Sequence, residues 1–256
     1  MSVSCLPPSA ASTGSALTSG ELSSIFSVPG ATWTTISRRV GTAFLLHDIE
    51  DEIARTIPGF PALAAACDAW RIRTFPGLVA QAGALVDYCA SSIGAFGALQ
   101  KSITGLGTDQ PLPAAIHAAA VAAIGELHDA TIARTLAIAP LTSDVASFRR
   151  ANAIADAQIE SYVARLGPSW ASLAPATGAV DDACGLVLGA WQAIGADLAD
   201  LASGSIAITS QLLLSLDIAS ALLSWRHLLD EAQAFASVAV GQERYLDGSW
   251  LSLGAQ

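Results

Sequence analysis

Charged side chains are scarce in this 256-residue chain. Lys, Arg, Asp and Glu make up 13% of its residues, whereas about 25% is typical of globular domains. The 12 basic residues form no cluster, and the formal net charge is −10. This argues against binding to nucleic acid through phosphates and against electrostatic attraction to anionic lipid. With 52% hydrophobic residues and a mean hydropathy of +0.50, we expect any membrane affinity to be hydrophobic.

Cysteine patterns and a signal peptide are also missing. The chain has no CxxC pair, and its four cysteines, Cys5, Cys67, Cys89 and Cys184, are too widely spaced for a disulfide scaffold. We interpret them as buried free thiols. The first twenty residues lack the basic region and the continuous apolar region of a secretory signal.

No catalytic motif is present. The sequence contains no GxSxG, HExxH, Walker or GxGxxG pattern, and no Glu-x-x-His pair for a metal site in a helical bundle. The nearest combinations are His47 with Asp51, the run 126–129, and His227 with Glu231. At helical spacing these are typical of solvated or surface pairs. We therefore expect no enzyme, no catalytic residue, no cofactor and no metal ligand.

Apolar side chains recur at helical spacing over most of the chain, and no stretch alternates with the period of a strand. The fold class predicted is all-α, an elongated bundle of about five or six long antiparallel helices. We expect a single domain, 1–256, with a flexible leader, 1–30, and a less regular tail, 242–256. The predicted helices are 34–55, 61–103 with a kink at Pro76, 114–139, a helix capped by Ser143 or Asp144 that ends near 166, 179–201, and 201–240. Gly- and Pro-rich connectors are expected at 105–113 and 167–178.

The longest apolar stretch covers residues 201–225 and contains a single charge, Asp217. It is long enough to cross a bilayer, but a carboxylate near the centre of a span costs about 2.5–3.5 kcal/mol. On one helix, Ser203, Ser210, Asp217 and Ser224 would form a polar stripe. Such a helix is either a central bundle helix or one whose stripe faces a pore lumen or a second protomer. The candidate membrane or protomer contacts are Leu212, Leu213, Leu214, Leu216, Asp217 and Ile218.

Three parts of the chain together resemble the helical pore-forming toxins of the haemolysin BL, non-haemolytic enterotoxin, cytolysin A and xenorhabdolysin group. They are residues 64–96 with Trp70 and Pro76, residues 142–162, and the pair 188–201 and 224–235 with Trp191 and Trp225. The resemblance implies long helices and a hydrophobic tongue or hairpin that enters lipid and oligomerises into a pore. The family's hydrophobic head would fall at the connector 167–178, which is too short for it. Either this chain is a non-inserting partner of a multi-component system, or another segment such as 201–216 inserts.

We therefore predict an α-helical pore-forming toxin, or a component of a multi-component one. Its expected partners are a lipid membrane and either other copies of the chain or a partner toxin subunit, with no nucleic acid. We expect release from the cell without a recognisable signal peptide, and a soluble state before membrane binding. The alternative is a soluble, non-enzymatic helical bundle that binds a protein partner or an apolar ligand.

Overall fold

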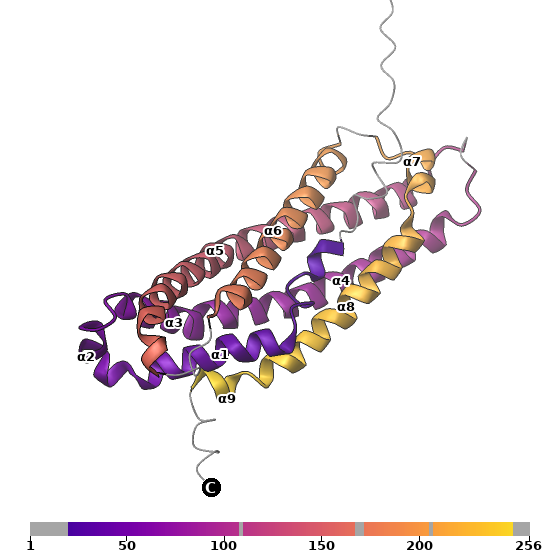
Figure 1. Cartoon of the computed structure of the whole chain (residues 1–256). Helices are drawn as coiled ribbons and strands as arrows, with labels where there is room; N and C mark the ends of the chain where they lie inside the picture. The colour runs from indigo at the N-terminus through magenta and orange to yellow at the C-terminus, as the bar shows by residue number, and fades with distance from the viewer. Residues whose placement is uncertain (1–19, 108–109, 167–171, 205–206, 248–256) are drawn as a thin grey trace, which may run out of the picture. The chain divides into compact units, whose positions relative to one another are not determined.

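The chain folds entirely into helices wherever its structure is described, which confirms the all-α prediction. The computed structural model describes residues 20–107, 110–166, 172–204 and 207–247, and no strand occurs among them (Figure 1). The α-helices are α1 (Gly30–Leu45), α2 (Glu50–Ala54), α3 (Phe60–Ala69), α4 (Phe75–Ile103), α5 (Ala114–Leu166), α6 (Ala174–Ala202), α7 (Ser210–Ser215), α8 (Ile218–Val240) and α9 (Glu243–Leu246). Two 3₁₀ turns, η2 (Gly20–Ser23) and η3 (His47–Ile49), and one π turn, η4 (Trp70–Thr74), complete the set.

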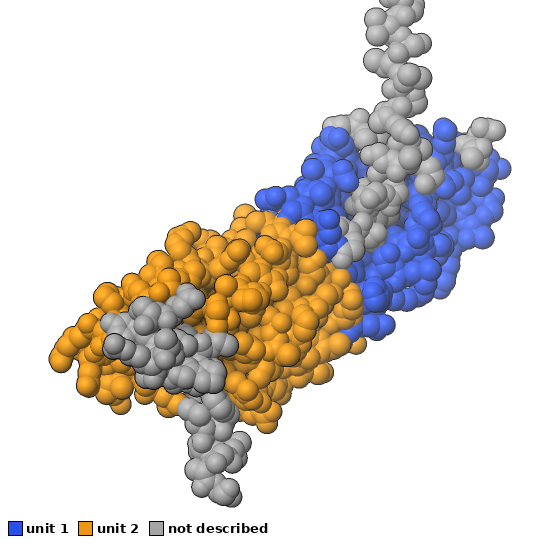
Figure 2. Space-filling view, in the orientation of Figure 1, with its two compact units in different colours: residues 1–22, 84–135, 189–230 blue, residues 23–83, 136–188, 231–256 orange. Residues whose placement is uncertain are grey.

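The contacts divide the chain into two compact units, coloured separately in Figure 2. Unit 1 contains residues 1–22, 84–135 and 189–230, and unit 2 contains residues 23–83, 136–188 and 231–256. Four helices, α4, α5, α6 and α8, each contribute residues to both units. The expectation of one domain over 1–256 stays a prediction.

Unit 2 has an aromatic core built around Trp33 of α1. Its ring centroid lies 5.9 Å from that of Phe75 and 5.4 Å from that of Phe235. Phe26, from the segment before α1, packs on Phe235 at 5.3 Å. A second pair, Trp70 with Phe148 of α5, has its centroids 4.4 Å apart. Tilted ring pairs at such distances contribute about 0.5–1.5 kcal/mol beyond the burial of their area.

Unit 1 is held by two further aromatic pairs that start from α4. Tyr88 meets Trp191 of α6 at a centroid distance of 4.9 Å, and Phe96 meets Trp225 of α8 at 5.2 Å, both edge to face. The helix α6 also approaches α5 closely, because a Cβ atom built on Gly195 would lie only 3.4 Å from Cγ2 of Thr131.

The predicted helix 61–103 contains one irregular turn, η4, directly before Pro76. There the N–H of Phe75 donates to the carbonyl oxygen of Trp70, five residues earlier. A proline has no N–H, and its ring clashes with the carbonyl group four residues before it. The wider π turn gives Pro76 room to enter the helix, so the irregularity predicted at this proline has a visible cause.

Pro140 does not end a helix, contrary to the sequence-based prediction. The helix α5 continues through it for 53 residues, so neither Ser143 nor Asp144 is an N-cap. Pro140 and Leu136 are both exposed, so water can solvate the carbonyl group that the proline leaves without a partner. Asp144 instead accepts two hydrogen bonds from Arg73, at 2.8 and 2.9 Å.

Other boundaries also differ from the prediction. The first helix begins at Gly30 and ends at Leu45, and η3 and α2 follow it where one helix over 34–55 was expected. Of the predicted leader, residues 1–19 lie outside the described residues, whereas Ile25 and Val28 are already buried. In the predicted tail, Leu246 of α9 is buried, and residues 248–256 lie outside the described part.

Asp156 of α5 joins three segments of unit 2. One carboxylate oxygen accepts a hydrogen bond from Arg39 of α1 at 3.0 Å. The other accepts from the backbone N–H of Leu173 and from the hydroxyl group of Ser172, immediately before α6. Both charged side chains are almost fully buried. Burial lowers the pKa of Arg39, and the bond to Asp156 opposes that shift.

We predict that Asp156→Ala strongly destabilises the protein, because it leaves the Arg39 charge buried without its carboxylate. Breaking a buried pair in this way costs about 3–5 kcal/mol. The control is Asp144→Ala, which removes the partner of the exposed Arg73 and should leave the melting temperature almost unchanged. Thermal unfolding followed by circular dichroism measures both. Equal melting temperatures for the two variants would contradict this role of Asp156.

Candidate functional site

The candidate site is the uncharged stretch, residues 201–216, which lies between Asp200 and Asp217. The sequence predicted one continuous helix through it and on to residue 240, and this prediction is wrong. The helix α6 ends at Ala202, α7 covers only Ser210–Ser215, and α8 begins at Ile218. Residues 205 and 206 lie outside the described part of the chain.

A glycine accounts for the end of α6. Gly204 has a φ of +74°, in the left-handed region that favours glycine at helix C-termini. Its N–H donates to the carbonyl oxygen of Leu201 at 3.3 Å, and the N–H of Ser203 donates to that of Ala199 at 2.9 Å. These bonds satisfy two of the last four carbonyl groups of α6, which helps the helix to end within an apolar sequence.

The polar residues after Gly204 make local bonds of their own. Thr209 is the N-cap of α7, since its hydroxyl oxygen accepts from the N–H of Leu212 at 3.1 Å. The buried hydroxyl group of Ser210 donates to the carbonyl oxygen of Gln110 at 2.7 Å. Within unit 1, this last bond joins the uncharged stretch to the connection between α4 and α5.

Asp217 lies at a helix boundary and not inside a helix. Its carboxylate accepts a hydrogen bond from the backbone N–H of Ser220 at 3.0 Å, which makes it the N-cap of α8. Its side chain is exposed, and its negative charge faces the positive end of the helix dipole. The predicted polar stripe of Ser203, Ser210, Asp217 and Ser224 therefore does not exist, because these residues do not share one helix.

Most of the apolar residues proposed as membrane or protomer contacts are buried in the core of unit 1. Leu213, Leu216 and Ile218 are buried, with relative exposures of 0%, 5% and 2%. Leu212 is half-buried and Leu214 is exposed. The buried leucines would have to leave the core of unit 1 before they could touch lipid.

Three of the four residues named for the family resemblance lie in the core, and the fourth is exposed. Trp70, Trp191 and Trp225 are the buried aromatic residues already described, and each faces a ring from another helix. Pro76 is exposed and follows the π turn. The three tryptophans therefore also have a role in core packing.

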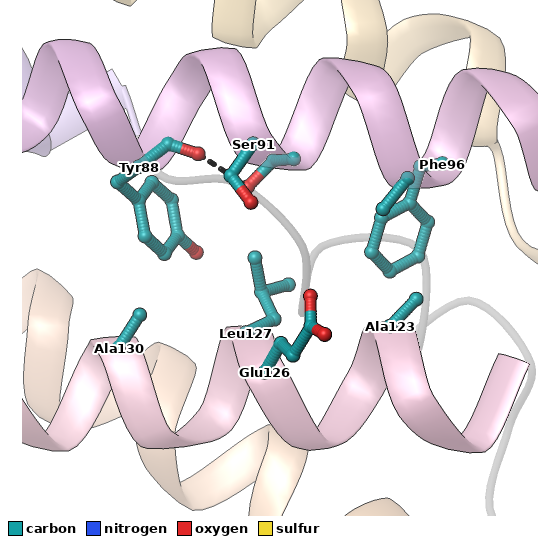
Figure 3. Close-up of a pocket in the computed structure, with 9 residues that line it drawn as sticks. Tyr88, Ser91, Phe96, Ala123, Glu126, Leu127 and Ala130 are labelled. Atoms are coloured by element: carbon teal, nitrogen blue, oxygen red, sulfur yellow. Dashed lines mark hydrogen bonds between the residues drawn. The ribbon is translucent and has the colours of Figure 1, made fainter. Parts of the chain in front are cut away.

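A small cavity lies between α4 and α5 in unit 1. Figure 3 shows Tyr88 and Phe96 on one helix facing Ala123, Leu127 and Ala130 on the other, with the hydroxyl group of Tyr88 directed toward α5. Burial raises the pKa of Tyr88. The cavity volume is about 40 Å³, which is enough for a few water molecules but far below the roughly 300 Å³ of ligand pockets.

The three described cysteines, Cys67, Cys89 and Cys184, are free and buried, as the sequence predicted. Burial raises the pKa of each thiol to about 12. Cys5 lies outside the described residues. At neutral pH the three thiols stay protonated and are poor nucleophiles.

Among the described residues, no group of three or more His, Cys, Asp and Glu side chains could hold a metal ion. His47 lies 3.1 Å from Glu50, one turn along the chain, and not in the pair with Asp51 that the sequence offered. This contact is a local surface interaction.

The comparisons with known proteins add no assignment: no known family, no curated protein and no solved structure matches this chain.

We predict that Asp217→Leu lowers the stability of unit 1 through loss of a helix cap. Replacing an N-cap residue by an apolar one costs about 1 kcal/mol, which corresponds to a fall of roughly 2–4 °C in melting temperature for a chain of this size. Asp217→Asn is the matched control, because asparagine also caps helices. Calorimetry should show a near wild-type transition for Asp217→Asn, and an equal loss in both variants would contradict the cap.

We also predict that the buried thiols resist modification in the folded protein. A disulfide reagent at pH 8 should label at most one thiol per chain, Cys5, until denaturant exposes the other three. Because the folded pKa values are raised, the protonated thiols favour the folded state below pH 9, and this contribution is lost as the pH rises through about 12. Rapid labelling of two or more thiols in native buffer would contradict this account.

Proposed function

We propose that this chain is a component of an α-helical pore-forming toxin, which acts by associating with a membrane and with other toxin subunits. Two features support the proposal: the all-α fold with its long helices, and the resemblance of three of its parts to that group. The strongest support comes from a third feature, the absence of charged residues over the uncharged stretch, residues 201–216.

The ends of this stretch favour a role at a membrane. Its charges lie outside it, since Asp200 is exposed near the end of α6 and Asp217 is exposed at the start of α8. The stretch could leave unit 1 and enter an apolar phase without carrying a carboxylate with it. The free-energy cost of placing the Asp217 carboxylate inside a membrane therefore does not apply to this stretch.

The length of the stretch favours a component that does not cross a membrane alone. Sixteen uncharged residues are fewer than the about 20 that a helix needs to cross a bilayer. Apolar segments too short to span a bilayer lie at the membrane–water interface or pack against other protein segments. A partner subunit, or several copies of this chain, would complete the pore.

One described helix, Phe60–Ile103, is long and apolar enough to cross a membrane, by length and composition only. In its most apolar window, 39% of the residues are buried within the protein. Core helices pass the same test, and the aromatic residues of this helix already face other helices. We therefore assign the membrane contact to the uncharged stretch and not to this helix.

Vesicle experiments test the proposal. The full chain should sediment with phosphatidylcholine vesicles, and Leu214→Glu should reduce this binding at least tenfold, because it places a charge in the stretch. Leu214 is exposed, so the variant should fold. Leu223→Glu is the matched control, an exposed leucine of α8 outside the stretch, and it should bind like the wild type.

Release of a trapped dye, by the chain alone and at acid pH, distinguishes a complete toxin from a component that needs a partner. If the wild type neither binds vesicles nor releases dye at any pH, the proposed membrane role is wrong. The soluble interaction or ligand-binding bundle is then the better description. Equal binding by Leu214→Glu and Leu223→Glu would move the contact away from residues 201–216.

A further inference from the structure

Unit 2 contains an apolar groove that includes the last described residue of the chain, Asp247. Its volume is about 470 Å³, within the range of about 300–1,000 Å³ that is usual for binding sites. The apolar residues of its lining come from α4, α8 and α9: Phe75, Pro76, Val79, Ala239, Val240 and Leu246. The groove shares no residue with the uncharged stretch, so its occupant is a question separate from the proposed membrane contact.

The apolar lining of the groove, and not its charge, needs a partner. Arg71 also lines the groove, but it already pairs with Asp68 at 3.6 Å and lies over the ring of Phe44. By contrast, Pro76 is exposed, and Val240 is 70% exposed. Exposed apolar side chains that gather in one concave surface are typical of an interaction site.

The chain itself supplies an apolar segment directly beside the groove. Residues 248–256 follow Asp247 with the sequence GSWLSLGAQ, which contains no charged side chain. Three of these residues are large and apolar: Trp250, Leu251 and Leu253. An extended chain covers about 3.3–3.6 Å per residue, so the Cα atom of Trp250 lies at most about 11 Å from that of Asp247. The segment can therefore reach the groove without a long connection.

Tethering and charge both favour this segment over a separate molecule. Because only a few residues join it to the groove, docking costs little loop-closure entropy and benefits from a high effective concentration. Glu243 and Asp247 line the groove, so an uncharged segment avoids the repulsion that an acidic partner would meet there. The described tryptophans of this chain are also all buried, each at most 3% exposed: Trp33, Trp70, Trp191 and Trp225.

We propose that residues 249–253 dock into this groove of their own chain, with the indole ring of Trp250 against its apolar lining. A tryptophan buries about 150–250 Å² of surface, which makes Trp250 the main contributor to the contact. Docking covers the side chains of Pro76 and Val240 in water. Any other molecule that uses the groove must first displace the segment.

The test measures the solvent exposure of Trp250 in the full chain. With 5-fluorotryptophan at all six tryptophan positions, the fluorine signal that is missing from Trp250→Phe identifies residue 250. A soluble nitroxide radical should broaden this signal in the wild type no more than the signals of the buried tryptophans. Val240→Glu should weaken docking about tenfold and expose Trp250 to the radical, because it places a charge in the apolar contact.

The matched control is Val121→Glu, since Val121 is an exposed valine of α5 in unit 1. In this variant Trp250 should stay protected from the radical. Circular dichroism melting curves show whether each variant is folded. Leu251→Glu alters the segment and no residue of the groove, so it gives a second test should Val240→Glu fail to fold, and it should expose Trp250 as well.

Three outcomes would overturn the proposal. If Trp250 is as accessible in the wild type as in the two groove and segment variants, the segment does not dock. If it is protected in all of them, its contact lies elsewhere. Protection that is lost on dilution of the protein would show that the segment binds a second copy of the chain. The experiment uses no lipid, so its result does not depend on vesicle binding through the uncharged stretch.

Discussion

The packing of this protein depends on the aromatic residues of one continuous segment, Phe60–Ile103. Four of them each meet a ring from a different helix: Trp70 meets Phe148 of α5, Phe75 meets Trp33 of α1, Tyr88 meets Trp191 of α6, and Phe96 meets Trp225 of α8. Few other large side chains are available, because aromatic residues make up only 6% of the sequence. The apolar character of this segment therefore reflects its place among four helices, which is why passing a test for membrane spans has little weight for it.

Local sequence patterns predicted helices well and their ends less well. Helical spacing gave the fold class, and the Gly- and Pro-rich run after residue 104 marked the connection between α4 and α5. The failures occurred where side-chain bonds or solvation decide the boundary. Pro140 remains inside α5 because its surroundings are exposed, and the stretch after Leu201 breaks because Gly204, Thr209 and Asp217 satisfy backbone groups there. A hydrophobicity pattern contains neither kind of information.

Long-range features could not be read from the sequence at all. The link from Asp156 to Arg39 spans 117 positions, and a groove in unit 2 is lined both by Phe75 and by Glu243. Their chemistry was visible only as isolated charges in a chain with few of them. For Asp217 the sequence-based prediction was wrong. It placed this carboxylate inside one helix long enough to cross a membrane, whereas Asp217 is an exposed residue that caps the start of α8.

The burial of apolar residues of the uncharged stretch in unit 1 affects its proposed role. Burial of one leucine or isoleucine contributes about 1.5–3 kcal/mol relative to water, so Ile208, Leu213 and Leu216 together oppose release into solvent by several kcal/mol. Lipid is as apolar as the core of unit 1, so transfer to a membrane recovers most of that energy. What remains to be broken is polar, chiefly the bond from Ser210 to Gln110, which contributes about 1 kcal/mol. Burial holds this stretch in unit 1 in water, and the proposed role requires it to exchange these contacts for those of a bilayer or another subunit.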